Sequence, residues 1–161
     1  MATITEEMKA CIQATSLCYA ATVNPDGTPN LSPKATLQAV DDEHIAFANI
    51  ASPNTARNLR QNPAIEINIV DIFLRRGFRF RGTARMFEEG SPEYDRIAGD
   101  TWARIGGSYP IYEIVMVKVE EAREVRSPGY EYAGFGDDAS IRATYQRAYG
   151  VQPLEPAEAA E

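Results

Sequence analysis

Short segments with strand character, separated by turn signals, are the feature of this chain that most constrains its fold. In Ala64–Asp71, apolar and polar residues alternate with a period of two, which is typical of a half-buried β-strand. Arg75–Phe87 alternates in the same way, with phenylalanines on one face and arginines on the other. By these criteria, strands are predicted over six segments: Leu17–Asn24, Asn30–Val40, His44–Asn49, Ala64–Asp71, Arg75–Phe87 and Tyr112–Val125.

Only short helices are predicted between these strands. Thr3 and Glu6 have capping-box spacing ahead of a helix over residues 5–14. Ser52-Pro53 and Ser91-Pro92 are typical helix starts, with serine at the N-cap and proline at the first helical position. Six strands with only brief helices between them favour an antiparallel barrel over a parallel α/β sheet. We therefore expect a mainly β fold, a six-stranded antiparallel barrel with a few short helices.

Composition and charge restrict the classes of partner. The chain has 161 residues, enough to bury a core in one domain, and a formal net charge of −7. An acidic chain has no electrostatic reason to bind nucleic acid or an anionic membrane surface. No apolar run approaches the ~20 residues that span a bilayer, and the N-terminus lacks the pattern of a signal peptide. We therefore expect no nucleic-acid or membrane partner. Cys11 and Cys18 are interpreted as free thiols, which favours a cytoplasmic location.

The composition changes after the last predicted strand. We expect the barrel domain to occupy residues 1–126 and a Gly- and Tyr-rich loop with a short helix, residues 127–150, to pack on the barrel or on a dimer partner. Residues 151–161 read as a disordered acidic tail. Aromatic residues in the loop, Tyr130, Tyr132 and Phe135, could cover a ligand or a dimer seam.

One group of residues has the chemistry of an anion site. Lys34 lies inside a predicted strand beside Ser32, in a chain with only three lysines. The free N–H groups at a helix start, here near Pro53, favour a phosphate, and a nearby hydroxyl and ammonium group would complete the site. A capped helix start and a solvated strand lysine are the ordinary alternatives.

Other candidate residues have ordinary structural explanations. His44, the only histidine, follows three acidic residues and is interpreted as a turn residue, so no catalytic triad can be assembled. The acidic turn residues are expected to be solvated rather than to bind a metal. Phe78 and Phe80 are expected in the core, and Arg79 and Arg81 on a solvated strand face.

The order of the segments resembles the pyridoxamine 5'-phosphate oxidase-like family, the FMN-binding split barrels. ATVNPDGTPNLSPKA is similar to the opening hairpin of that family, and ASPNTARNLRQNPAI to its phosphate-binding strand-to-helix turn. FRGTARMFEEGSPEYDRIA resembles its later strand and the helix after it. The resemblance spans residues 5–125 and implies a split β-barrel of the FMN-binding type.

The resemblance also implies a homodimer with FMN sites at the interface. Ser32, Pro33, Lys34 and Ala35 would line the isoalloxazine ring and the ribityl chain. The other residues that the resemblance places at the cofactor are Ala48, Asn49 and Ile50 at the ring, Asn54, Thr55 and Arg57 at the phosphate, and Trp102 or the arginine strand from the partner subunit. Members often have a basic residue at the position of Asn54 or Thr55, so here either the phosphate charge would fall to Lys34 and Arg57 or the affinity would be weak.

The expected activity is that of the cofactor, electron or hydride transfer between FMN and a small-molecule donor or acceptor. The chain offers no catalytic acid or base that the sequence identifies. It also lacks a match to the C-terminal segment that carries the vitamin B6 substrate residues of the oxidase proper. A flavin carrier or sensor without turnover, or a split barrel that uses deazaflavin or haem, remains the alternative.

Overall fold

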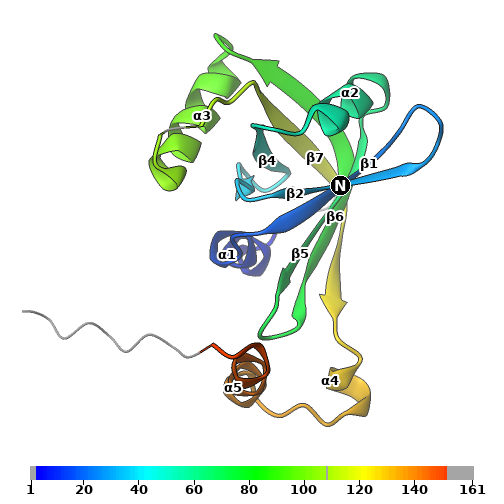
Figure 1. The fold of residues 1–161 in the computed structure, drawn as a ribbon, viewed down its shortest axis with the longest axis vertical. Helices are drawn as coiled ribbons and strands as arrows, with labels where there is room; N and C mark the ends of the chain where they lie inside the picture. The colour runs from blue at the N-terminus through cyan, green and yellow to red at the C-terminus, as the bar shows by residue number, and fades with distance from the viewer. Residues whose placement is uncertain (1–2, 108, 152–161) are drawn as a thin grey trace, which may run out of the picture.

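The computed structural model describes residues 3–107 and 109–151, which form one strongly curved antiparallel sheet with short helices around it (Figure 1). The order of the strands across the sheet is β2-β1-β5-β6-β7-β4-β3. Their bounds are β1 Cys18–Val23, β2 Pro29–Lys34, β3 Gln38–Ala39, β4 His44–Asn49, β5 Ala64–Asp71, β6 Arg76–Glu88 and β7 Glu113–Arg126. The expectation of a mainly β, antiparallel split barrel is confirmed.

The sheet has seven strands rather than six because the segment predicted as one strand over Asn30–Val40 is divided. Its first part, β2, pairs with β1 at one edge of the sheet, and its second part, β3, pairs with β4 at the opposite edge. Only residues 35–37 join the two parts, so the two edges of the sheet must lie close together. This short connection bridges the two edges of the curved sheet, as in a split barrel.

The interior of the barrel is filled by the inward-facing residues of the strands. Phe47, Ile67, Phe80 and Val117 are fully buried there, as the period-two pattern predicts. Phe78 is buried as well, so both phenylalanines of β6 belong to the core. A second, smaller core cluster lies on the other side of β4 and β7, where Ile97 of the helix after β6 packs on Ile114.

Three helices pack around the barrel: α1 (Glu6–Ala14), α2 (Pro53–Gln61) and α3 (Pro92–Ile105). The predicted starts of α2 and α3 at Ser52 and Ser91 are confirmed. The cap of α1 is Thr5, whose hydroxyl accepts a hydrogen bond from the N–H of Met8, so the capping box predicted at Thr3 is wrong. Among the described residues, no helix is both long and apolar enough to cross a membrane.

The C-terminal segment forms a separate layer at the tip of the β5–β6 hairpin, below the barrel in Figure 1. It contains α4 (Gly129–Tyr132), which the sequence did not predict, and α5 (Asp138–Tyr149). We call residues 127–151 the C-terminal unit. Arg142 pairs with Asp71 at 2.7 Å and Arg76 with Asp138 at 2.7 Å, which ties α5 to the hairpin. The tail predicted to be disordered lies, apart from Val151, outside the described residues.

Candidate functional site

A cavity of about 340 Å³ lies where the end of β2 faces the connection from β4 to α2. We call it the Lys34 cavity. It is open to solvent, because Pro33, Ala35 and Ala51 in its lining are exposed. Six of the residues named from the sequence line it, together with three others; the full lining is Ser32, Pro33, Lys34, Ala35, Thr36, Ala48, Ile50, Ala51 and Ser52.

The ammonium group of Lys34 is the buried charge of this cavity. The residue is only 6% exposed, although lysine is rarely fully buried unless it is paired. Nζ donates hydrogen bonds to Ser32 Oγ and, at 3.2 Å, to the carbonyl oxygen of Pro33, and it lies 5.6 Å from the ring centre of Phe47. In the part of the chain that the structure describes, no carboxylate pairs with it. Burial lowers the pKa of Lys34, and nearby Cys18 opposes that shift.

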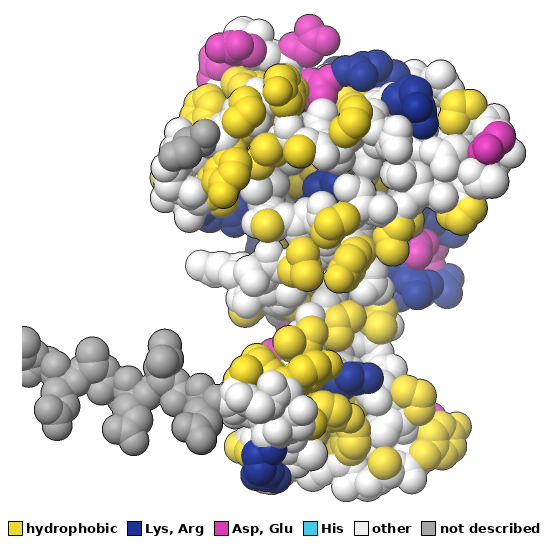
Figure 2. All heavy atoms as spheres, in the orientation of Figure 1, with side chains coloured by type: hydrophobic (Ala, Val, Ile, Leu, Met, Phe, Trp, Pro, Cys, Tyr) yellow, Lys and Arg dark blue, Asp and Glu magenta, His cyan; other side chains and the backbone are white. Residues whose placement is uncertain are grey.

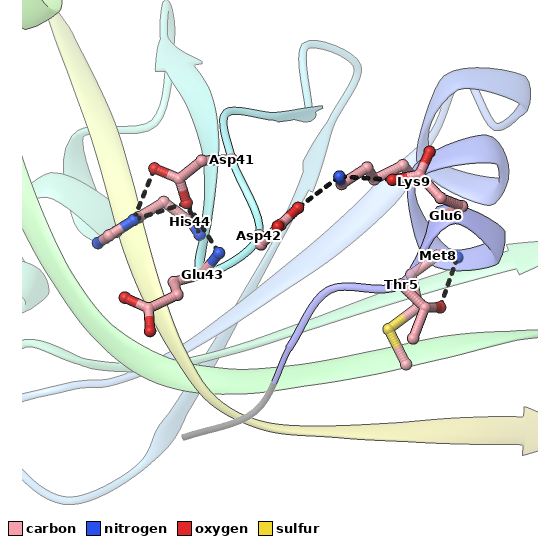
Figure 3. A network of polar contacts seen from close by, with 8 residues as sticks. All are labelled: Thr5, Glu6, Met8, Lys9, Asp41, Asp42, Glu43 and His44. Carbon is pink, nitrogen blue, oxygen red and sulfur yellow. Dashed lines mark hydrogen bonds and ion pairs between the residues drawn. The ribbon is translucent and has the colours of Figure 1, made fainter.

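Unlike Lys34, Lys9 and His44 each pair with a carboxylate group. Lys9 Nζ lies 2.7 Å from Glu6 and 2.6 Å from Asp42, so its charge is balanced by two carboxylates (Figure 3). Nδ1 of His44 lies 2.9 Å from Asp41 in the turn before β4. Figure 3 therefore shows a surface network that fixes α1 and this turn. His44, predicted to be a turn residue, is instead the first residue of β4, and its ring pairs with Asp41 of the turn.

The start of α2 borders the Lys34 cavity through Ser52. The serine side chain does not cap the helix, and its hydroxyl donates instead to Asn49 Oδ1 at 2.8 Å. The first-turn N–H groups of α2 are therefore left without a side-chain cap. Neither Asn54 nor Thr55 lines the cavity: Asn54 is exposed, and Thr55 is buried with its hydroxyl accepting from Asn30 at 3.3 Å.

Three further candidate residues also lie outside the cavity lining. Asn49 is buried and its amide binds Glu113 and Ser52. Arg57 is exposed on α2. Trp102 packs against the second core cluster and donates its indole N–H to the carbonyl oxygen of Tyr109 at 3.0 Å, and it is not among the residues that line the cavity.

Sequence reasoning missed Thr36, Ala51 and Ser52 in the lining. The Thr36 hydroxyl accepts a hydrogen bond from the N–H of Ala48 at 2.9 Å and so joins the two walls of the cavity. Thr36 lies two residues after Lys34, and no sequence motif identified it as a cavity residue. Ala51 and Ser52 follow β4 directly, and the predicted helix start at Ser52-Pro53 was the signal that could have included them.

An apolar face covers the outside of β1 and β2, next to the cavity. In these paired strands Tyr19 lies opposite Pro33, and Ala21 opposite Leu31. Leu31 is 65% exposed and Tyr19 is 44% exposed. We call the outward residues Leu17, Tyr19, Val23, Pro29, Leu31 and Pro33 the apolar face. Figure 2 shows hydrophobic side chains gathered across the middle of one side of the molecule and over the C-terminal unit below it.

The outer side of the sheet becomes ionic toward β5, β6 and β7. Arg79 pairs with Glu66 at 3.2 Å, and Glu121 is shared by Arg81 and Arg123. The three arginines are more than half exposed, so the solvated arginine face predicted from the sequence is confirmed.

Comparison with known proteins places residues 4–151 in one family. These residues match the family model described as pyridoxamine 5'-phosphate oxidase. The HupZ protein of Group A Streptococcus is 33% identical, with a TM-score of 0.66 over 77% of this chain and 95% of that chain. No curated protein matches the chain.

More distant solved structures share the fold. An FMN-binding protein from Syntrophomonas wolfei is 17% identical, with a TM-score of 0.67 over 76% of this chain and 86% of that chain. A Clostridium acetobutylicum protein related to general stress protein 26, of the pyridoxinephosphate oxidase family, is 16% identical. Its TM-score is 0.60, over 74% of this chain and 86% of that chain.

Proposed function

This chain belongs to the pyridoxamine 5'-phosphate oxidase family, and we propose that it binds FMN non-covalently in the Lys34 cavity and acts as an oxidoreductase. The observation that carries this proposal is the buried ammonium group of Lys34, for which the described residues offer no carboxylate. A buried charge without a counter-ion costs stability unless a ligand compensates it. An anionic cofactor would supply that compensation.

The other lining residues fit the remaining parts of FMN. A volume of about 340 Å³ lies within the range of small-molecule sites, and an open mouth leaves room for the rest of a larger ligand. Ala48 and Ile50 offer apolar contact to a ring, and Ser32 offers a hydroxyl. The uncapped start of α2 suits a phosphate group, because helix N–H groups and the helix dipole favour anions. The likeness to the FMN-binding protein of Syntrophomonas wolfei agrees with this proposal.

When bound, FMN would supply electron or hydride transfer through its isoalloxazine ring, with a small molecule as donor or acceptor. The chain's own residues would hold and orient the cofactor. Lys34 and Ser32 would donate to acceptor atoms of the cofactor, and the apolar wall at Ala48 and Ile50 would exclude water.

We propose that the functional form is a two-fold symmetric homodimer joined through the apolar face. Exposed apolar side chains in adjacent strands are typical of an interface. The ion pairs on the outer side of β5, β6 and β7 lie beside them and would provide a polar rim with both signs of charge. Both signs within one rim let the same surface pair with itself. Pro33 belongs to the apolar face and to the cavity lining, so a second subunit on this face would extend the open wall of the cavity.

A flavin carrier without turnover is the second candidate. It is favoured by the cavity lining, which in the described residues contains no histidine, cysteine or carboxylate that could transfer a proton. We place either function in the cytoplasm, which the two free cysteines support.

Reduction of the bound flavin tests the enzyme proposal. The protein loaded with FMN is mixed anaerobically with NADH or NADPH, and flavin absorbance is followed before and after air is admitted. Rapid bleaching and steady consumption of the nicotinamide in air support an oxidoreductase. If the protein stays yellow and no NADH or NADPH is consumed, the result supports the flavin carrier.

A further inference from the structure

Residues 48–52 form one wall of the Lys34 cavity, and a buried network outside the cavity holds this wall in place. Ala48, Ile50, Ala51 and Ser52 are four of the nine lining residues. Asn49 lies in the middle of this segment, but it does not line the cavity and is only 6% exposed. What fixes Asn49 therefore fixes the wall on both sides of it.

Asn49 joins the wall to β7 and to Ser52. Its Nδ2 donates to Glu113 Oε2 at 2.5 Å. Its Oδ1 accepts from the hydroxyl of Ser52 at 2.8 Å and from the N–H of Ser52 at 3.3 Å. The Asn49 backbone is aligned as well, because Asn49 and Glu113 are direct partners in the pairing of β4 with β7.

Glu113 is buried and bound on both carboxylate oxygens. It is 6% exposed, and Arg60 near the end of α2 donates to its Oε1. The Arg60 side chain is 56% exposed, so it remains solvated if this contact is lost. Glu113 therefore connects the end of β4 with the far end of α2, and hydrogen bonds to a charged acceptor are among the stronger ones in proteins.

The network also determines what Ser52 does. Serine at an N-cap ordinarily accepts a hydrogen bond from the first helical turn, as Ser91 does at α3, where the N–H of Tyr94 lies 3.3 Å from its hydroxyl. The hydroxyl of Ser52 is instead directed to Asn49. Asn49, held by Glu113, thereby keeps the start of α2 free of its own cap.

We infer that Glu113 is a positioning residue for the cofactor cavity, acting through Asn49 on the wall at residues 48–52. The inference rests on the proposed function, since it assigns to this network the placing of groups that hold the FMN ring and phosphate. Glu113 itself does not line the cavity, and the network adds no chemistry of its own.

The test measures affinity for FMN and for riboflavin, which lacks the phosphate, by quenching of flavin fluorescence. The proteins are the wild type, Glu113→Ala, Asn49→Ala and the double variant. Tyr130→Phe is the control; it removes the 2.7 Å hydrogen bond that the hydroxyl of Tyr130, in the C-terminal unit, donates to the carbonyl oxygen of Leu74 in the β5–β6 turn, away from the cavity lining. We expect Glu113→Ala to weaken FMN binding at least tenfold and to reduce the preference for FMN over riboflavin. The double variant should be no weaker than Asn49→Ala, because Glu113 acts through Asn49.

Hydrogen exchange in the ligand-free proteins gives a readout that does not depend on FMN. The amide of Ser52 should exchange faster in Glu113→Ala than in the wild type, with exchange in β6 unchanged. Unchanged exchange at Ser52, FMN affinity within twofold of the wild type, or losses that multiply in the double variant would each overturn the inference. A wild type that binds no FMN would instead overturn the proposed function, and exchange at Ser52 would still decide the role of Glu113.

Discussion

Cys18 and Lys34 lie directly opposite each other in the pairing of β1 with β2, and both side chains are buried. Burial raises the pKa of Cys18 to about 12, although the nearby ammonium group opposes the shift. The thiol is therefore neutral at physiological pH and cannot serve as the counter-ion of Lys34. A buried ammonium group beside a neutral thiol leaves the compensating charge to a ligand.

Replacing Lys34 with methionine should separate cofactor binding from stability. Methionine fills a similar volume without a buried charge, so the free energy of unfolding of the ligand-free protein should stay the same or rise. FMN affinity should fall by about 1.5–3 kcal/mol, the value of a charge-assisted contact, which is roughly tenfold to a hundredfold. Denaturant unfolding and fluorescence titration measure the two quantities.

Lys118→Met is the matched control, since Lys118 is exposed on β7 and the change of charge is the same. It should leave FMN affinity unchanged. Equal affinities for the wild type and Lys34→Met would remove Lys34 from the site.

Both thiols should resist modification while the protein is folded. With a pKa of about 12, Cys18 is thiolate in roughly one molecule in ten thousand at pH 8, and the thiolate is the reactive form. Burial also raises the pKa of Cys11, which is half-buried on α1. Reaction with a chromogenic disulfide at pH 8 should be slow until denaturant is added, with Cys18 the slower; Cys18→Ala assigns the phases. Rapid labelling of Cys18 in the folded protein would contradict the burial of this pair.

Local patterns predicted most of the fold because period-two alternation and Ser-Pro helix starts are local signals. They placed the strands around Ala64–Asp71 and the starts of α2 and α3. They did not reveal the division of the segment Asn30–Val40, because its two halves pair with different strands at opposite edges of the sheet. The choice of partner strand depends on the whole sheet, and residues 35–37 contain no Gly or Pro that marks the break.

Residues that line the Lys34 cavity were easier to predict from the sequence than residues that hold its wall from outside. Lys34 was conspicuous because lysine is scarce in this chain. Glu113 gave no signal, because a glutamate at the start of a strand is ordinary until Asn49 and Arg60 are seen to bind it. Asn49 was placed at the cofactor by resemblance, whereas in the structure its amide faces this network.

Leu31→Asp should disrupt the proposed dimer. Two-fold symmetry would bury two unpaired carboxylates in one interface, each at a cost of several kcal/mol, so dimer affinity should fall by about a hundredfold or more. Light scattering on a sizing column at micromolar concentration would show a monomer. The control Tyr132→Asp changes an 83% exposed residue on α4 outside the apolar face and should remain dimeric. A dimer of unchanged stability in Leu31→Asp would place the interface elsewhere.

Acid should loosen the C-terminal unit through Asp71. Burial, the largest influence, raises the pKa of Asp71, but the N–H groups of Leu74 and Phe73 and the guanidinium group of Arg142 together lower it. A carboxyl group with a folded-state pKa below its unfolded value of about 3.9 stabilises the fold above that pH, and the contribution is lost as pH falls through the folded-state pKa.

The stability of Asp71→Asn should therefore fall less than that of the wild type between pH 6 and pH 3, as measured by denaturant unfolding. Glu131→Gln, which changes an exposed residue on α4 without an ion pair among the described residues, should follow the wild type. Parallel pH profiles for Asp71→Asn and the wild type would contradict the assignment.

The most direct test of FMN binding in the Lys34 cavity is an absorbance spectrum of the purified protein, recorded after FMN is added and the excess is removed by desalting. Flavin bands in the blue and near ultraviolet should survive desalting in the wild type and be lost in Lys34→Met. A colourless wild-type protein, or equal retention of FMN by both proteins, would contradict FMN binding in this cavity.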